Sequence, residues 1–470
     1  MCLDLTTDNE HDATVENELV TIKNLVAEAF DNKDQTALLE AISSYDKMTA
    51  TDIIDSYRAR LIFQKAEALD LLAQLERSNK RLEQAISTFN QVLTLKKVSA
   101  DLFRDAGHKS VSLSKFRGWY THAIETQKKI ISKFPDSVDE LNSLGILLLY
   151  MNQNSEAKVV FEQLLVKYPN DGIALVHLGF ILKLEGSSNS KALDVNEQKK
   201  LQLTLEKGAN YLEKGIATQT PGVLEGKFFF HLGDALKRLG KTIKADKVYE
   251  EAAKVGAIPS FWQRSLYNVN GLKAKPTWEV SELDVQNQLN TIKENWKLIR
   301  KEALDIFERN LYQVESENLS EMGRWAQFEL YRQGRKVERN CKNAPTTCNL
   351  IDAIPQISKN RRGQVKFSWM EAGTHIHAHS GPTNCRLRAH LGLKIPENLS
   401  SDENISESST KLRVADQYVT WKDGEMFIFD DSFDHEVWHD NPQKESRLVL
   451  ILDLWHPELT EYQKMTLPAI

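Results

Sequence analysis

The hydrophobic positions of this chain follow two different periods, and the change falls near residue 320. From about residue 15 to 255, apolar residues recur with helical spacing and β-branched runs are few. Past residue 325 the apolar residues alternate along short runs, at 364–370, 386–393, 426–429 and 447–455. Gly and Pro residues separate these runs. We therefore predict a helical N-terminal region and an antiparallel β-sheet C-terminal region.

The helical region repeats with a period of 34 residues, and segment 139–172 fits a tetratricopeptide repeat. Gly145 and Ala157 are small because the two helices of a repeat cross near them. Pro169 ends the second helix because it has no N–H to donate. Further copies of the pattern include Ala123 with Pro135, Leu178 with Gly179, Gly233 with Ala245, and a weaker one at Ala85 with Phe89. The alternative is a generic helical bundle. A repeat array presents a concave surface that binds peptide or protein.

The two patterns divide the chain into four predicted segments. They are a disordered N-terminus at 1–14, a tetratricopeptide-repeat helical domain at 15–258, a helical junction at 259–320, and a β domain at 321–470. Many short strands separated by turns indicate a sandwich or a barrel, and the double-stranded β-helix, or jelly roll, is one such architecture. The predicted fold class is thus multidomain α + β, a helical solenoid followed by a jelly roll.

Composition narrows the possible functions. The 470 residues are 41% hydrophobic and 27% charged, as is ordinary for a soluble protein, and the net charge of -6 argues against a general nucleic-acid binder. No apolar run is long enough to span a membrane, and the first residues do not resemble a signal peptide. Four cysteines are too few for a disulfide scaffold, although Cys341 and Cys348 are close enough to bridge one loop. Asn-x-Ser sequons at Asn318, Asn398 and Asn404 fit a secretory compartment.

Histidines concentrate in the β region, where seven of the 12 lie between residues 375 and 456. His375, His377 and His379 alternate, so on an extended strand they would share one face. His435 follows a second strand, and Arg447 opens the next one. Two neutral imidazoles from separate strands suit Fe(II). A downstream arginine offers a bidentate partner for a dicarboxylate, and this order is found in 2-oxoglutarate oxygenases.

Several runs of residues make the similarity specific. They are GRWAQF at 323–328, HSGPTNCRLR at 379–388, IFDDSFDHEVW at 428–438, DLWHPELT at 453–460 and LPAI at 467–470. These runs closely resemble the aspartyl/asparaginyl β-hydroxylases, which are Fe(II)- and 2-oxoglutarate-dependent dioxygenases. The preceding repeats look like the tetratricopeptide domain of that family. The resemblance therefore covers most of the chain after the first few dozen residues.

The resemblance implies a role for each matching residue. His379 and His435 match the iron ligands, and Arg447 matches the residue that pairs with the distal carboxylate of 2-oxoglutarate. Further contacts to that co-substrate are implied for Trp325, Ser368, Arg388 and His390. Substrate contacts are implied for Gln327, Lys366 and Arg386. By the same resemblance, Cys341 and Cys348 form a disulfide.

Gly381 tests this interpretation. Most 2-oxoglutarate oxygenases carry Asp or Glu two residues after the first histidine, as part of a facial triad. The β-hydroxylase family shares a glycine at this position and works with two histidines, water filling the vacant place. Asp430 or Asp431 could still donate a carboxylate, although a role in the turn or in fixing His435 fits them better. His375 and His377 are either partners of a ligand or polar residues on the strand face.

We accordingly predict an oxygenase that uses Fe(II), 2-oxoglutarate and O₂ to hydroxylate the β-carbon of Asp or Asn in protein substrates, by resemblance in EGF-like domains. One alternative keeps the chemistry and changes the substrate, since bacterial relatives act on lipid acyl chains. Another is a non-catalytic repeat scaffold. The family works in the endoplasmic reticulum, which is the predicted location, with the cytoplasm as the alternative. The sequence leaves open the target proteins, the preference between Asp and Asn, and the oligomeric state.

Overall fold

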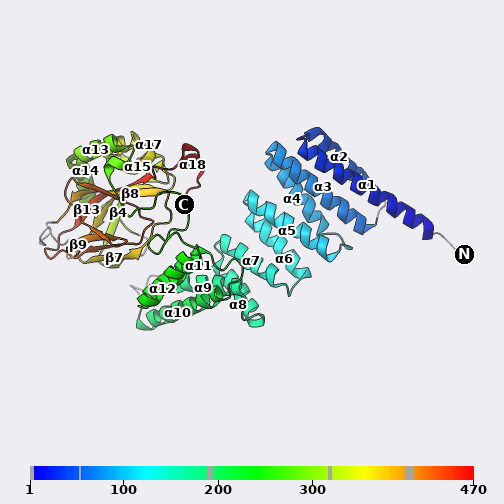
Figure 1. Cartoon of the computed structure of the whole chain (residues 1–470), viewed down its shortest axis with the longest axis horizontal. Coiled ribbons are helices and arrows are strands. Elements are labelled where there is room, and N and C mark those ends of the chain that lie inside the picture. The colour runs from blue at the N-terminus through cyan, green and yellow to red at the C-terminus, as the bar shows by residue number, and fades with distance from the viewer. Residues whose placement is uncertain (1–4, 52–53, 188–193, 316–319, 397–405, 407) are drawn as a thin grey trace. The chain divides into compact units, whose positions relative to one another are not determined.

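The computed structural model describes residues 5–51, 54–187, 194–315, 320–396, 406 and 408–470, so the three sequon asparagines lie outside the described residues. The chain forms two compact units (Figure 1). One comprises residues 1–185 and 210–223, and the other comprises residues 186–209 and 224–470. This division groups the last pair of repeat helices with the β domain, whereas the predicted domain boundary lies at residue 258.

The first unit is built from helices packed against their neighbours in chain order. They are α1 (Leu5–Asp31), α2 (Gln35–Thr49), α3 (Asp55–Glu76), α4 (Asn79–Val92), α5 (Ala100–Arg117), α6 (Tyr120–Lys133), α7 (Val138–Tyr150), α8 (Asn154–Lys167) and α9 (Gly172–Gly186). A tenth helix, α10 (Val195–Ala217), crosses from the second unit into the first. The first helix begins at Leu5, inside the segment 1–14 for which disorder was predicted. No glycine or proline interrupts its sequence before residue 31.

Small residues at helix crossings confirm the repeat pattern. A Cβ atom added to Gly145 would come within 2.4 Å of the Phe161 ring, and one added to Gly233 would come within 2.2 Å of Tyr249. These two positions are equivalent in different repeats, which shows why the repeat requires glycine there. Ala157 is completely buried in the same crossing as Gly145.

The second unit contains the last helix pair, α11 (Gly226–Arg238) and α12 (Thr242–Lys254), followed by the β domain. Its remaining helices are η1 (Val280–Glu282), α13 (Gln286–Glu294), α14 (Trp296–Glu308), α15 (Glu338–Cys341), α16 (Pro345–Asp352), α17 (Pro355–Ser358) and α18 (Glu461–Thr466). Among the described residues, no helix combines the length and apolar character that a membrane crossing requires.

Two antiparallel sheets form the β domain, an arrangement compatible with the predicted jelly roll. The larger sheet has the order β1 (Thr277–Trp278), β11 (Met426–Phe429), β8 (Arg386–Lys394), β13 (Arg447–Trp455), β6 (Gln364–Met370), β4 (Trp325–Arg332), β2 (Gln313–Val314), with β5 (Arg335–Lys336) paired to β4. The smaller sheet has the order β10 (Gln417–Val419), β9 (Thr410–Val414), β12 (His435–His439), β7 (Thr374–His379), β3 (Ser320–Met322).

The larger sheet is buried on both faces. Leu448, Leu450 and Leu452 of β13 join an apolar core with side chains of α13, α14 and α16. Val449 and Ile451, which alternate with them, join a second core with residues of the smaller sheet. Because side chains alternate along a strand, β13 supplies both cores, and all nine of its residues are buried.

Cys341 and Cys348 are bonded to one another, as the resemblance implied, with their Cα atoms 5.8 Å apart. The disulfide joins α15 to α16 within the helix-side core. The cysteine at position 385 is buried and unbonded.

Candidate active site

A β-bulge in β7 decides where its histidines point. His435 pairs with His379, and Val437 pairs with Ile376, so β7 has one more residue than β12 between the two pairs. The extra residue reverses the alternation of side chains at this point. His379 therefore lies beside His435, and the expectation that three histidines share one face is wrong.

The imidazoles of His379 and His435 lie next to each other, with ring centroids 4.2 Å apart and planes inclined by 52°. The Nδ1 atom of His379 is 2.7 Å from the carbonyl oxygen of His377, and that of His435 is 2.8 Å from the carbonyl oxygen of Phe433. Because a carbonyl only accepts, each Nδ1 carries the proton and donates it. In the neutral ring this leaves the lone pair on Nε2, the atom that a metal would bind.

Burial keeps His435 neutral. Its side chain is almost wholly enclosed, and desolvation, together with repulsion from His379, lowers its pKa to about 3. A neutral imidazole is the form that coordinates a metal, so the ring is held in a ligating state at neutral pH.

Arg447 is a buried cation with unused donors. It is 2% exposed, and its Nε and Nη1 atoms have no hydrogen-bond partner in the described part of the chain. Its guanidinium lies 4.2 Å from the centroid of the Trp421 ring. Desolvation lowers the pKa of Arg447 to about 9. A buried arginine whose donor groups are free to form hydrogen bonds is suited to binding an anion.

His390 belongs with Arg447, Trp421, Phe429 and His435 to a group of buried, adjoining side chains, which we call the chamber. Its Nδ1 accepts a hydrogen bond of 3.2 Å from the indole N–H of Trp421, while its Nε2 has no described partner. Burial first, and then the positive charge of Arg447, lowers the pKa of His390 well below its usual value. The Phe429 ring lies 5.2 Å from that of His390 and 5.4 Å from that of His435. An unbroken line of rings thus runs from the paired histidines to Arg447.

The remaining predicted pocket residues of β4 and β6 form two groups. The indole N–H of Trp325 donates to Ser368 Oγ at 2.9 Å. Beside them, Lys366 Nζ lies 3.0 Å from a carboxylate oxygen of Glu315, and Gln327 donates to the other oxygen at 3.2 Å. Glu315 could not be predicted as a site residue, because a single acidic residue just after a two-residue strand belongs to no sequence pattern.

Two arginines of β8 are engaged in internal ion pairs. Arg388 contacts both oxygens of Asp453, at 2.8 and 3.0 Å. Arg386 Nη2 lies 2.7 Å from Asp431, and the same carboxylate is 3.3 Å from Arg388 Nη1. All four side chains are buried or nearly so. The attraction of Arg386 and Arg388 outweighs desolvation and holds the pKa of Asp431 below its ordinary value.

Asp431 occupies the space beside Gly381. The Gly381 N–H donates to the backbone oxygen of Asp431, and a Cβ at Gly381 would come within 2.5 Å of Oδ2 of the Asp431 carboxylate. A carboxylate side chain two residues after His379 therefore has no room. The Asp431 carboxylate is itself engaged by Arg386 and Arg388. Asp430 instead accepts hydrogen bonds from the N–H and hydroxyl of Ser432, within the turn.

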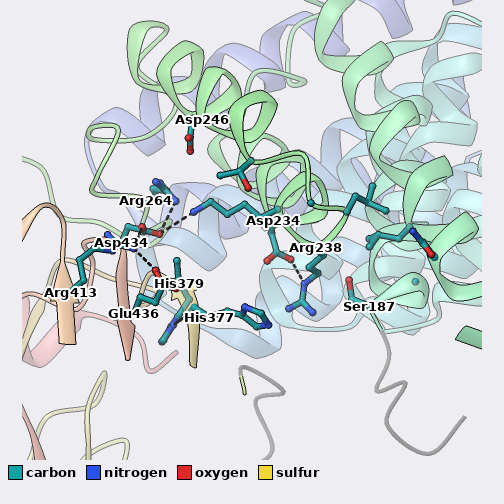
Figure 2. A pocket seen from close by; sticks show the side chains of 18 of the residues that line it. Ser187, Asp234, Arg238, Asp246, Arg264, His377, His379, Arg413, Asp434 and Glu436 are labelled. Carbon is teal, nitrogen blue, oxygen red and sulfur yellow. Dashed lines mark hydrogen bonds and ion pairs between the residues drawn. The ribbon is translucent and has the colours of Figure 1, made fainter. Parts of the chain in front are cut away.

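His375 and His377 lie outside the paired-histidine site. His375 stacks on Trp438 and lies 2.8 Å from Glu436. His377 is exposed and lines a cavity of about 880 Å³ on the outer side of the smaller sheet (Figure 2). The side chains of both residues lie on the strand face, while the backbone oxygen of His377 accepts a hydrogen bond from the His379 ring.

That cavity reaches His379. Its lining combines residues of β7, β9 and β12 with residues of α10, α11 and α12, including His377, His379, Arg413, Asp234, Lys237 and Asp246. Both walls belong to the second compact unit. The cavity gives a large molecule a way to the edge of the histidine pair.

Comparison with known proteins assigns the domain. The aspartyl/asparaginyl β-hydroxylase family model matches residues 293–457, which include the histidine pair and Arg447. The C-terminal domain belongs to the aspartyl/asparaginyl β-hydroxylase family. Tetratricopeptide-repeat models match residues 66–98, 143–171 and 226–255.

Two mammalian relatives are similar to this protein over nearly the whole chain, and not only over the β-hydroxylase domain. Human aspartyl/asparaginyl beta-hydroxylase is 40% identical over 98% of this chain and 56% of its own length. The mouse protein is 39% identical over 98% of this chain and 57% of its own length. The chain thus spans a little over half the length of these relatives. Ornithine lipid ester-linked acyl 2-hydroxylase of Rhizobium tropici is 34% identical over 34% of this chain and 51% of its own length.

Proposed function

We propose that this protein is an Fe(II)- and 2-oxoglutarate-dependent dioxygenase that hydroxylates the β-carbon of Asp or Asn residues in protein substrates. The observation that carries the proposal is the buried Arg447. Two of its donor atoms have no partner among the described residues, and it lies at the end of a line of rings that begins at His379 and His435. Such a chamber fits a dicarboxylate held beside a metal.

The donor set fits iron. Two imidazoles with their Nδ1 atoms engaged by carbonyl oxygens offer nitrogen ligands of the kind that Fe(II) takes in oxygenases. His379 and His435 would hold the ion. Gly381 has no side chain to supply the usual carboxylate, and Asp431 fills the space beside it.

The chamber also fits 2-oxoglutarate. Arg447 would pair with the distal carboxylate, and His390 Nε2 and Ser368 Oγ are polar groups along the same interior face. Trp325 holds the Ser368 hydroxyl in place through its indole N–H. Arg388 would contribute positive charge, although its guanidinium is already shared with Asp453.

When bound, the metal and 2-oxoglutarate supply the oxidation, in which O₂ converts 2-oxoglutarate to succinate and CO₂ and leaves one oxygen atom for a C–H bond. The protein orients the reactants and excludes water. Phe429 and Trp421 enclose the chamber with apolar rings. Lys366, Gln327 and Arg386 would orient the acidic or amide side chain of the substrate, because cationic and amide N–H groups bind carboxyl oxygens.

EGF-like domains are the proposed substrates, and the endoplasmic reticulum is the proposed location. The cavity of about 880 Å³ beside His379 would admit one loop of such a domain. The Cys341–Cys348 bond fits an oxidising compartment. Human aspartyl/asparaginyl beta-hydroxylase, as its name states, acts on the two side chains proposed here.

A lipid acyl chain is the second candidate substrate, because the Rhizobium relative is an acyl 2-hydroxylase. The polar lining of the cavity favours a protein substrate, since charged residues on both walls would have to be desolvated by an acyl chain. The repeats, which match models of protein-binding modules, favour it further.

The proposal is tested by loading purified protein with Fe(II) and 2-oxoglutarate under anaerobic conditions, adding an EGF-like peptide and admitting oxygen. Mass spectrometry should find one added oxygen on an Asp or Asn of the peptide, and succinate should accumulate. His379→Ala, which removes one proposed ligand, should give neither product.

The outcomes separate the alternatives. Succinate without a modified peptide would mean that the oxygenase chemistry is right and the substrate class is wrong. Hydroxylation of an acyl lipid in place of the peptide would support the second candidate. If neither product forms although iron is bound, the scaffold interpretation holds.

A further inference from the structure

Residues 260–269, which we call the strap, connect α12 to the β domain and lie across the loop that precedes His435. The Arg264 N–H donates to the backbone oxygen of Ser432 at 3.1 Å, and the Asp434 N–H donates to that of Trp262 at 2.6 Å. Between these two bonds, Gln263 forms a β-bridge with Phe433. Three consecutive residues before His435 are thereby fixed by three consecutive residues of the strap.

The same strap holds the loop that follows His379. The N–H groups of Leu266 and Tyr267 both donate to the backbone oxygen of Pro382, at 3.1 and 2.9 Å. Further along, the Val269 N–H donates to the side-chain oxygen of Asn384 at 2.9 Å. One short segment therefore touches both loops that carry the paired histidines.

Arg264 is the central side chain of the strap. It is 3% exposed, and its Nη1 lies 2.8 Å from Asp434 Oδ1, while its Nε donates to the backbone oxygen of Phe261 at 2.8 Å. Its guanidinium also lies 3.8 Å from the centroid of the Tyr249 ring on α12. Figure 2 shows Asp434 facing Arg264, with Arg413 beside it.

Asp434 gathers cations from three parts of the unit. Besides Arg264 of the strap, Arg413 of β9 lies 3.0 Å away, and Lys237 of α11 lies 3.6 Å away. The carboxylate is 2% exposed, so without these partners its charge would be strongly unfavourable. The ion cluster thus ties the last repeat helices to the residue next to His435.

The strap acts on the orientation of the His435 ring. The ring donates its Nδ1 proton to the Phe433 backbone oxygen, and the Phe433 peptide lies between the two backbone bonds made by the strap. A shift of this peptide would rotate or tilt the imidazole and move Nε2. Hydrogen-bond partners of metal-bound histidines control metal affinity in this way.

We propose that Arg264 is a positioning residue for the metal site, acting through Asp434 and the Phe433 carbonyl. The inference rests on the proposed metal binding by His379 and His435. It extends the site beyond the segment matched by the β-hydroxylase family model, because Arg264 precedes residue 293. By the same inference, the last repeat helices help to position the metal site, because Tyr249 contacts Arg264 and Lys237 contacts Asp434.

The test is a titration of the full chain with Mn²⁺ in the presence of 2-oxoglutarate, followed by electron paramagnetic resonance of the free ion. Arg264→Met, which keeps the length of the side chain and removes its charge and donors, should weaken Mn²⁺ binding by about tenfold. Arg264→Lys restores the charge near Asp434 but cannot also hold the Phe261 carbonyl, so its affinity should fall between those of the wild type and Arg264→Met.

Glu302→Gln is the matched control. Glu302 accepts hydrogen bonds from the N–H groups of Thr346 and Thr347 at the start of α16, on the helix side of the larger sheet. The control should lower the thermal midpoint without altering Mn²⁺ affinity, which separates loss of stability from loss of positioning.

Wild-type affinity in both Arg264 variants, or an equal loss in Glu302→Gln, would overturn the inference. Arg264→Lys decides the question if Arg264→Met does not fold. A wild-type protein that binds no Mn²⁺ would instead contradict the proposed function.

Discussion

The two faces of strands β8 and β13 have the same backbone and opposite chemistry. Toward the helices, the strands present an apolar surface, which comprises Leu387, Ala389, Leu391, Leu393, Leu448, Leu450, Leu452 and Leu454. Toward the smaller sheet, the alternate positions carry the apolar Val449 and Ile451 together with polar and charged groups, which are Arg386, Arg388, His390, Arg447 and Asp453. Both faces are buried, so burial alone does not distinguish structural from functional residues.

The difference lies in whether polar groups find partners. Arg386 and Arg388 each have a carboxylate partner within the chain, Asp431 for Arg386 and Asp453 for Arg388. Arg447 keeps two donor atoms without a described partner. Since an unpaired buried charge costs several kcal/mol, its presence indicates that another molecule completes the site.

Truncation on the apolar face should produce the largest loss of stability. Leu450→Ala removes a completely buried side chain from the helix-side core. We expect the free energy of unfolding to fall by about 2–5 kcal/mol, measured by urea denaturation. Affinity for Mn²⁺ and 2-oxoglutarate, measured on folded protein, should be unchanged. A selective loss of ligand affinity would show that the two faces are not separate.

A substitution at Arg447 should have the opposite effect, with stability retained and ligand affinity lost. Arg447→Met fills a similar volume and removes an unpaired buried charge, so stability should be equal to that of the wild type or higher. Affinity for 2-oxoglutarate, measured by calorimetry on Mn²⁺-loaded protein, should fall about 100-fold, which corresponds to about 2.7 kcal/mol. A marked loss of stability with retained affinity would show that Arg447 stabilises the fold and does not bind the ligand.

The smallest expected effect is a loss of stability on acidification, which arises from His439 on the interior face of β12. Its ring accepts from the Thr410 hydroxyl and donates to the Glu445 backbone oxygen. Burial, with repulsion from Arg447, lowers its pKa to about 4, below the ordinary 6.5. The unfolded chain therefore takes up a proton first, and stability present above pH 6.5 is lost as the pH falls toward 4.

Between pH 7 and pH 5.5, His439 should account for a loss of about 1 kcal/mol in the free energy of unfolding. His439→Gln can still accept from Thr410 and donate to Glu445, and it does not titrate. Urea denaturation at both pH values should show a smaller decrease for this variant than for the wild type. Equal decreases would mean that the ring is not held neutral by its surroundings.

Much of the larger sheet could be predicted from the sequence, because alternation leaves a local signal. The runs at 364–370, 426–429 and 447–455 coincide with β6, β11 and β13, and the run at 386–393 matches β8 to within one residue. The repeat helices were predictable because helical spacing and the 34-residue repeat are also local signals. The disulfide followed from the resemblance, and it is present.

The parts that escaped prediction depend on partners distant in sequence. The bulge that turns His379 away from His377 arises from pairing with β12, and nothing local marks the extra residue. Glu315 is identified as part of the site only by its contacts with Lys366 and Gln327, which are distant in sequence. Residues 260–269 carry no helix or strand period, so the sequence indicated only a junction.

The strap also has a consequence for the order in which the protein matures. Its hydrogen bonds to the loops around His379 and His435 span from 115 positions, between Val269 and Asn384, to 172 positions, between Trp262 and Asp434. A chain that leaves the ribosome from its N-terminus displays the strap long before its partners exist, and contacts of such sequence separation form slowly. The strap's contacts with the loops around His379 and His435 therefore form late in biosynthesis. Until then, Trp262, Phe261 and Arg264 are exposed on a nascent chain, where a chaperone has time to bind them.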